Sequence, residues 1–192
     1  MLSAIIATQE SERALVPTLA ALVPGAAAGL IAEVIVADAG SSDATAEVAD
    51  IAGCRFIASP ESIGARLRAA AASARAPWLM FLRAGTVPEP GWIDSADRFI
   101  RATERLEGAS RAAVFRPAGA ADLLRPGLAE LVSVFRVVLG GGPRPEQGLL
   151  IAKRFYVDVG GHPEGVDAEI ALLKHLGRRH LAMLSTAATP PH

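Results

Sequence analysis

The sequence predicts an α/β protein with a mainly parallel, mixed sheet and helices on both of its faces. Short β-branched apolar runs alternate with longer helical stretches, a pattern that is typical of βαβ units. The 192 residues are 51% apolar and 20% charged, which is too apolar for a disordered chain and enough for a full core. We therefore expect one globular domain over residues 1–192.

The first half of the chain contains the clearest strands and is expected to be Rossmann-like. Residues 33–38 form an apolar, β-branched run that ends at Asp38, and the turn after it offers Ser42 or Asp43 as a helix cap. The predicted strands are residues 3–7, 33–38, 55–57 and 78–82, and the predicted helices are residues 11–22, a helix ending at Ala52, and residues 64–74.

The second half continues the alternation with weaker signals. The predicted elements are a helix from residues 88–91 to about 106, strands 112–115 and 149–151, helices 154–159 and 167–176, and a last strand 181–184. Apolar residues recur at helical spacing from Leu124 to Leu139, which predicts an amphipathic helix over residues 123–139. This helix could pack on the core, or contact a membrane surface or a second copy of the chain.

Composition excludes several classes of function. The formal net charge is -1, so the chain has no overall positive field and nucleic acid is not an expected partner. The single cysteine, Cys54, excludes a disulfide framework and fits a reducing compartment, and the N-terminus lacks a signal-peptide pattern, so we expect a cytoplasmic location. The glycine motifs of P-loop kinases and Rossmann dehydrogenases are absent from the sequence.

Polar residues follow three strands that we expect to lie side by side. Thr8 and Glu10 follow the first strand, Asp38 and the turn at residues 40–43 follow the second, and residues 83–86 follow the fourth. Ligands of parallel sheets bind beyond the carboxyl ends of the strands, where loops and helix N-termini present free N–H groups. The Asp38 carboxylate could accept hydrogen bonds from a nucleoside, or it could stabilise its own turn.

Three motifs together resemble the family 2 glycosyltransferases of GT-A fold, in particular the short stand-alone bacterial members. They are residues 4–10 (AIIATQE), 33–45 (EVIVADAGSSDAT) and 78–86 (WLMFLRAGT), and the resemblance continues in residues 146–148, 153–163 and 167–169. It implies that a sugar moves from a UDP- or GDP-linked donor to an acceptor hydroxyl group, with inversion by direct displacement. It also implies a nucleotide-binding half over about 1–85 and an acceptor half over about 86–192.

The resemblance also implies roles for single residues. Thr8, Glu10 and Asp38 match positions that hold the nucleoside, and Asp167 matches the acidic residue that acts as general base. A base is needed because the acceptor hydroxyl group must lose its proton as the new bond forms. From the residues alone, Asp167 could instead cap the helix that begins there, and Glu169 could face water on its first turn.

The metal motif departs from the family pattern. An Asp-x-Asp signature holds Mg²⁺ or Mn²⁺ against the diphosphate in the family, and here the residues are Arg83, Ala84 and Gly85. We therefore expect no metal ligands at this place, although the family implies a divalent ion. Ala39, Arg68 and Val166 also stand where the family usually has Asp, Asn and Glu.

Two functional hypotheses follow from these departures. In the first, Arg83, helped by Arg66 or Arg68, neutralises the diphosphate leaving group, because a planar guanidinium can bind phosphate oxygens bidentately. The chain would then be a metal-independent transferase. In the second, catalysis has been lost, and the chain serves as a binding or scaffold protein. The three arginines Arg66, Arg68 and Arg75 could also form a solvated helix face.

Overall fold

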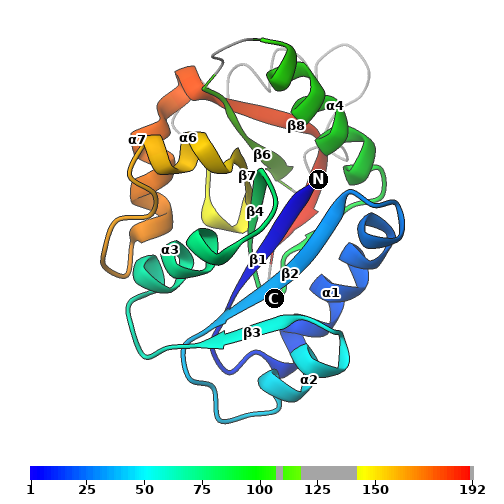
Figure 1. Ribbon diagram of the computed structural model, residues 1–192, viewed down its shortest axis with the longest axis vertical. Coiled ribbons are helices and arrows are strands. Elements are labelled where there is room, and N and C mark those ends of the chain that lie inside the picture. The colour runs from blue at the N-terminus through cyan, green and yellow to red at the C-terminus, as the bar shows by residue number, and fades with distance from the viewer. Residues whose placement is uncertain (107–109, 118–141, 191–192) are drawn as a thin grey trace.

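The computed structural model describes residues 1–106, 110–117 and 142–190 (Figure 1). The helix predicted over residues 123–139 lies outside these ranges. In chain order, the elements are β1 (Leu2–Thr8), α1 (Glu12–Ala27), β2 (Ile31–Asp38), α2 (Thr45–Ile51), β3 (Arg55–Ala58), α3 (Ile63–Ser73), β4 (Trp78–Arg83), β5 (Val87–Pro88), α4 (Trp92–Arg105), β6 (Ala112–Pro117), the 3-10 helix η1 (Pro145–Gln147), β7 (Leu149–Ala152), α6 (Lys153–Asp158), α7 (Ala168–His180) and β8 (Leu181–Thr189).

One mixed sheet runs through the fold in the order β3-β2-β1-β4-β7-β6-β8-β5. The strands β1 to β4 pair in parallel, β7 pairs antiparallel with both β4 and β6, and β6 and β8 are parallel. The mixed α/β sheet predicted from the sequence is therefore confirmed. The register of β1 places Thr8 opposite Asp38 on β2 and Ala7 opposite Arg83 on β4, so polar residues collect at one end of the parallel strands.

Two hydrophobic clusters lie on opposite faces of the sheet. One joins the sheet to α1, α2 and α4, and the other joins it to α3, α6 and α7 (Figure 1). Successive side chains of a strand point to opposite faces, so Ile6 belongs to the first cluster and Ile5 to the second. Both faces of β1 are buried, which explains why its sequence is continuously apolar. Within the described ranges, no helix has the length and apolar character needed to span a membrane.

Helix α1 runs further than the sequence predicts. The prediction ends at Leu22 because Pro24 and Gly25 follow, but the helix continues to Ala27. Trp92 of α4 packs against Gly25, where an added Cβ would lie 2.6 Å from the indole ring, and its indole N–H donates to the Ala21 carbonyl at 3.1 Å. This tertiary contact compensates for the poor helix propensity of proline and glycine.

The far edge of the sheet also differs from the prediction. The last strand extends to Thr189 rather than ending at Leu184, because β8 pairs with β6 on one side and with the two-residue strand β5 on the other. Strand β5 has too few residues to show a period-2 pattern in the sequence, so only the pairing of Val87 with Thr189 reveals it.

Helix α3 lies unusually close to the loop that precedes α7. A Cβ added to Gly64 would lie 1.9 Å from the carbonyl oxygen of Pro163 and 2.9 Å from the Ala168 side chain. The φ and ψ angles of a helix suit any residue, so the glycine is required here by space alone. Gly64 therefore sets how near α3 can approach the loop and the first turn of α7.

We predict that Gly64→Ala destabilises the chain by about 1–3 kcal/mol, because the added methyl group forces α3 away from Pro163. Urea unfolding monitored by circular dichroism measures this difference. Ala69→Ser, at an exposed position of the same helix, is the matched control and should change the unfolding free energy by less than about 0.5 kcal/mol. Equal stability of the two variants would contradict the close approach.

Candidate functional site

The carboxylate of Asp38 organises the turn after β2. It accepts four hydrogen bonds, from the Thr8 hydroxyl at 2.7 Å, the Gly40 N–H at 2.7 Å, and the Ser41 N–H and hydroxyl, both at 2.6 Å. Burial opposes ionisation of this fully buried group, but the hydrogen bonds from Ser41, Thr8 and Gly40 outweigh burial and lower the pKa of Asp38 below its ordinary 3.8. The turn-stabilising alternative weighed for Asp38 is thus realised, and its nucleoside-binding role stays a prediction.

Glu10 joins the loop after β1 to the same turn from the solvent side. Its N–H donates to the Ser41 hydroxyl at 2.8 Å, and its carboxylate accepts the Ser42 N–H at 2.8 Å. The backbone of Glu10 adopts a φ of +45°, which is uncommon for a residue with a side chain and is held by these contacts. Glu10 is exposed, whereas Thr8 is buried beneath it, so Glu10 is the one of the two that a ligand in solution can reach.

Arg66 of α3 is buried under the ends of β1 and β2, which excludes a solvated helix face for this residue. Its Nη1 donates to the carbonyl oxygens of Thr8 at 3.1 Å and Ala37 at 2.8 Å. Burial lowers the pKa of Arg66, while attraction to the carboxylates of Asp38 and Glu169 opposes this shift. The guanidinium therefore lies within electrostatic range of both carboxylates, so the strand-end turn and the first turn of α7 belong to one region.

Arg68 reaches from α3 to the loop before α7. Its Nη1 donates to the carbonyl oxygen of His162, and its Nη2 forms an ion pair with Glu164 at 3.2 Å. These contacts, together with Gly64, fix the loop against α3. In this structure the guanidinium of Arg68 binds partners within the chain. The sequence-based proposal that Arg68 assists a diphosphate remains untested.

Arg83, at the end of β4, is paired with two carboxylates. Its Nε donates to Glu169 Oε2 at 2.9 Å, its Nη2 donates to the same oxygen, and its Nη1 lies 3.8 Å from Glu146 Oε1. The hydrogen bonds that Arg83 donates to Glu169 raise the pKa of Arg83, against the opposing effect of burial. Sequence reasoning missed both partners, and the expectation that Glu169 faces water is wrong, because the residue is only 7% exposed.

The segment around η1 brings Glu146 to this site. Gln147 is buried, and its side-chain amide donates to the Phe115 carbonyl at 2.6 Å while its amide oxygen accepts the Arg144 N–H at 2.8 Å. Gly148 follows with a φ of +63° and lies against β4, where a Cβ would be 2.7 Å from the Leu82 side chain. Residues 146–148 (Glu-Gln-Gly), which belong to the family resemblance, were the sequence signal available for this position.

Asp167 occupies the N-cap position of α7. Its carbonyl oxygen accepts the Ala171 N–H at 2.8 Å, but its side chain makes no capping hydrogen bond. The capping role considered for its carboxylate is therefore wrong. Asp167 is exposed and precedes by two residues the buried Glu169, which is paired with Arg83, so an exposed acidic residue lies at the same end of α7 as the Arg83 partner.

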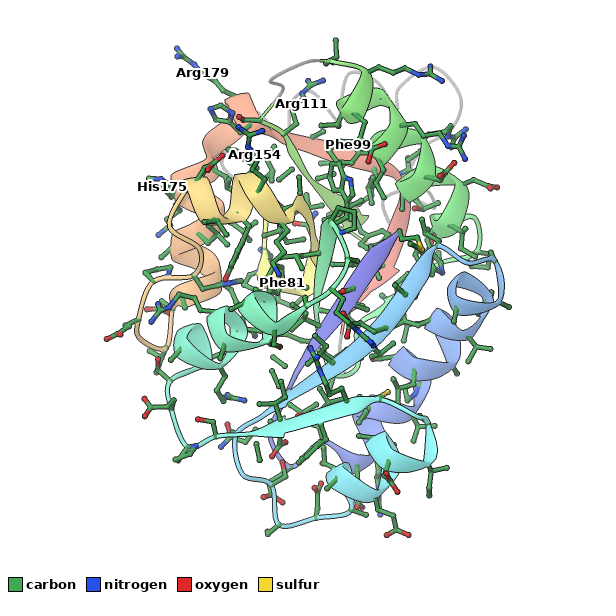
Figure 2. All side chains as sticks on the ribbon, in the orientation of Figure 1. Phe81, Phe99, Arg111, Arg154, His175 and Arg179 are labelled. Atoms are coloured by element: carbon green, nitrogen blue, oxygen red, sulfur yellow. The ribbon has the colours of Figure 1, made fainter. Side chains whose placement is uncertain are left out.

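An aromatic cluster supports the loop below these charges. The Tyr156 hydroxyl lies 2.8 Å from His162 Nδ1 and accepts the His162 N–H at 3.1 Å. The ring of Phe81, which is labelled in Figure 2, packs edge-on against the imidazole of His162. Burial and, to a smaller extent, the charge of Arg68 lower the pKa of His162 to about 4, and burial raises the pKa of Tyr156 to about 12. Both rings are therefore uncharged at neutral pH, which makes His162 a packing residue.

Two cavities adjoin the end of β4. A cavity of about 10 Å³, roughly the space of one water molecule, is lined by Phe81, Gly148, His162 and Glu169 among others. A second cavity, of about 410 Å³, lies between α1, the loop after β4 and the end of β8. It is lined by Arg13, Ala14, Pro17, Gly85, Val87, Thr189 and Pro190. Of these two cavities, only the second has the volume of a small-molecule site. One of its lining residues, Gly85, follows Arg83 by two positions.

The residues at the expected metal position do not fit Mg²⁺ or Mn²⁺. Hard cations take oxygen ligands, but Arg83 offers a guanidinium and Gly85 has no side chain. In the part of the chain that the structure describes, no three Asp, Glu, His or Cys side chains are grouped so that they could hold a metal ion. Glu169 and Glu146 are both directed at the Arg83 cation instead.

We predict that Asp38→Asn destabilises the chain by about 1–3 kcal/mol at neutral pH, because the amide group cannot accept all four hydrogen bonds. A carboxyl group whose pKa is lowered by folding contributes its full stability above its unfolded pKa, and this contribution is lost as the pH falls through the folded pKa. The difference between wild type and variant, measured by urea unfolding across pH, should narrow below pH 3.8. Asp50→Asn, at an exposed position, should show no such dependence.

Comparison with solved structures identifies the fold. Glucosyl-3-phosphoglycerate synthase from Mycobacterium tuberculosis, in complex with Mn²⁺, uridine diphosphate and glucosyl-3-phosphoglycerate, aligns with a TM-score of 0.65 at 20% identity, covering 95% of this chain and 68% of that chain. The same enzyme with Mn²⁺ and uridine-diphosphate-glucose gives 0.64 at 19% identity, with the same coverage. This likeness shows the GT-A fold that the sequence resemblance implied.

The sequence itself identifies the family. No curated protein matches the chain. The family model described as glycosyl transferase family 2 matches residues 3–117, from the second residue of β1 to the end of β6, and so includes the polar ends of the parallel strands. This match spans more than half of the 192 residues. The chain therefore belongs to glycosyl transferase family 2.

Proposed function

We propose that this chain transfers a glycosyl group from a nucleoside diphosphate sugar to an acceptor hydroxyl group, with inversion at the anomeric carbon. The observation that carries the proposal is the exposed Asp167 at the N-terminus of α7, which makes no side-chain capping hydrogen bond and precedes by two residues Glu169, the partner of Arg83. The start of α7 thus supplies a candidate base and also holds a candidate cation, and the reaction needs both.

Asp167 is the proposed general base. As the acceptor hydroxyl attacks the anomeric carbon, its proton passes to the Asp167 carboxylate, while the bond to the diphosphate breaks and its electron pair leaves with the phosphate oxygen. A single displacement of this kind inverts the anomeric carbon. The loop that carries Asp167 is fixed by Gly64 and Arg68, so the carboxylate is held on a rigid support.

The donor is proposed to lie along the carboxyl ends of β1, β2 and β4. Glu10 is the exposed acidic group there, and Thr8, Asp38 and Arg66 shape the turn from below. The similar synthase structures contain uridine diphosphate, which supports UDP as a first donor nucleotide to test, with GDP as the alternative. In this assignment, residues 1–85 bind the nucleotide and residues 86–192 supply Asp167 and the acceptor side.

Transfer is proposed to proceed without a divalent metal ion. The similar synthase binds Mn²⁺ with its nucleotide, but Arg83 and Gly85 supply no oxygen ligand here. A guanidinium can stabilise the charge that develops on a leaving diphosphate, although it is a single charge rather than a double one.

A binding or scaffold role without turnover is the second candidate. It is favoured by Asp38 and Arg66, whose polar atoms are engaged by partners within the chain rather than left open to a ligand. Binding tolerates such losses better than catalysis does, because catalysis needs several electrostatic groups acting together.

We predict that Asp167→Asn lowers the rate of sugar-nucleotide hydrolysis or transfer by about 10²–10⁴-fold, because the amide cannot take up a proton. Release of UDP or GDP from a panel of nucleotide sugars, measured by a coupled assay, gives this rate. Asp158→Asn, at an exposed position at the end of α6, is the matched control and should retain the wild-type rate.

Two other results would change the assignment. Unchanged turnover in Asp167→Asn would exclude this residue as the base. Nucleotide binding by the wild type without turnover of any donor would favour the scaffold function over catalysis.

A further inference from the structure

We propose that Glu169 is a positioning residue that holds the Arg83 guanidinium as a built-in cation, in the place a divalent metal ion would take between Glu146 and Glu169. This inference rests on the proposed function, because it assigns the diphosphate of the donor to the remaining edge of that guanidinium. It names Glu169 and Glu146 as parts of the site.

The hydrogen-bond pattern leaves one edge of Arg83 available. A guanidinium carries five N–H donors, and two of the Arg83 nitrogens, Nε and Nη2, donate to the same oxygen of Glu169. Nη1 is 3.8 Å from Glu146, which is ion-pair range but too long for a hydrogen bond. Among the described residues, the Nη1–Nη2 edge thus retains N–H groups without a hydrogen-bond acceptor, in the fork geometry that binds two phosphate oxygens.

Burial makes Glu169 a rigid support rather than a competing surface charge. The Glu169 side chain is 9% exposed, while that of Arg83 is 35% exposed, so the carboxylate is covered and the guanidinium reaches the surface. Glu169 also lies in the first turn of α7, where the helix dipole stabilises a negative charge. The covered carboxylate therefore lies beneath the arginine and fixes its orientation.

The same geometry explains how the cation excludes a metal ion. Glu146 and Glu169 come from η1 and α7, segments far apart in the chain, and both carboxylates are directed at one positive group. Two converging carboxylates are enough donors for Mg²⁺ or Mn²⁺, because such an ion keeps several water molecules as its other ligands. Because Arg83 already neutralises them, a divalent ion would meet a fixed positive charge at close range.

The test uses the whole chain and Mn²⁺ alone, followed by electron paramagnetic resonance of the free ion. The wild type should not bind Mn²⁺ at this site. Arg83→Gln, which removes the charge and leaves both carboxylates, should bind Mn²⁺ at least about tenfold more tightly than any residual binding by the wild type. Arg83→Lys, which keeps the charge, should behave as the wild type does.

Two further variants assign the gained site. Adding Glu169→Gln to Arg83→Gln should abolish the Mn²⁺ binding, because one of the two carboxylates is lost. Arg101→Gln, which breaks a surface ion pair with Asp97, is the matched control and should bind no more Mn²⁺ than the wild type. Tight Mn²⁺ binding by the wild type, or none by Arg83→Gln, would overturn the proposal.

Calorimetry with UDP and GDP then tests the edge assigned to the diphosphate. The wild type should bind with equal affinity in EDTA and in Mn²⁺, whereas Arg83→Gln should bind about tenfold or more weakly in EDTA and recover in Mn²⁺. Wild-type affinity that requires Mn²⁺ would overturn the proposal. If neither nucleotide binds the wild type, the proposed function fails and so does the diphosphate edge, while the Mn²⁺ titrations still decide whether Arg83 is the internal cation.

Discussion

The buried guanidinium of Arg66 is the contact on which the geometry of the polar strand ends depends. It binds the carbonyl oxygens of Thr8 and Ala37, which belong to neighbouring strands, and it rises from a helix on one face of the sheet. Carbonyl groups at strand ends must find donors when they are covered. Because Arg66 donates to both carbonyls, and adds to the Ala39 N–H that also reaches the Thr8 carbonyl, α3 can cover this edge closely.

Arg66 and Arg83 show how differently two arginines of one region can be used. Arg66 is bound by neutral oxygens and lies within electrostatic range of carboxylates, so its charge serves the fold. Arg83 is paired with the side chain of Glu169 and extends to the surface, so its charge is presented outward. A reader of the sequence sees two arginines near a sheet edge. Only the direction of each side chain separates a structural role from a candidate role in chemistry.

The sequence predicted the parallel half of the sheet well because its strands are continuous apolar runs bounded by turns, as in β1 and β4. It predicted that polar residues gather after these strands because parallel strands share an edge. It could not predict the Arg83–Glu169 pair, because a polar residue on the first turn of a helix ordinarily faces water and its partner lies on a strand 86 residues away. The length of α1 could not be predicted either, because the tertiary contact with Trp92 outweighs the local helix propensity.

The buried, neutral His162 makes the stability of the fold depend on pH. Its imidazole is packed against Phe81 and Tyr156, and folding lowers its pKa from 6.5 to about 4. Between these two values the unfolded chain binds a proton that the folded chain does not, so folding stability falls as the pH drops from 6.5 towards 4 and this contribution is constant below it. Mildly acidic pH therefore lowers the free energy of unfolding, although the histidine is still uncharged in the folded protein.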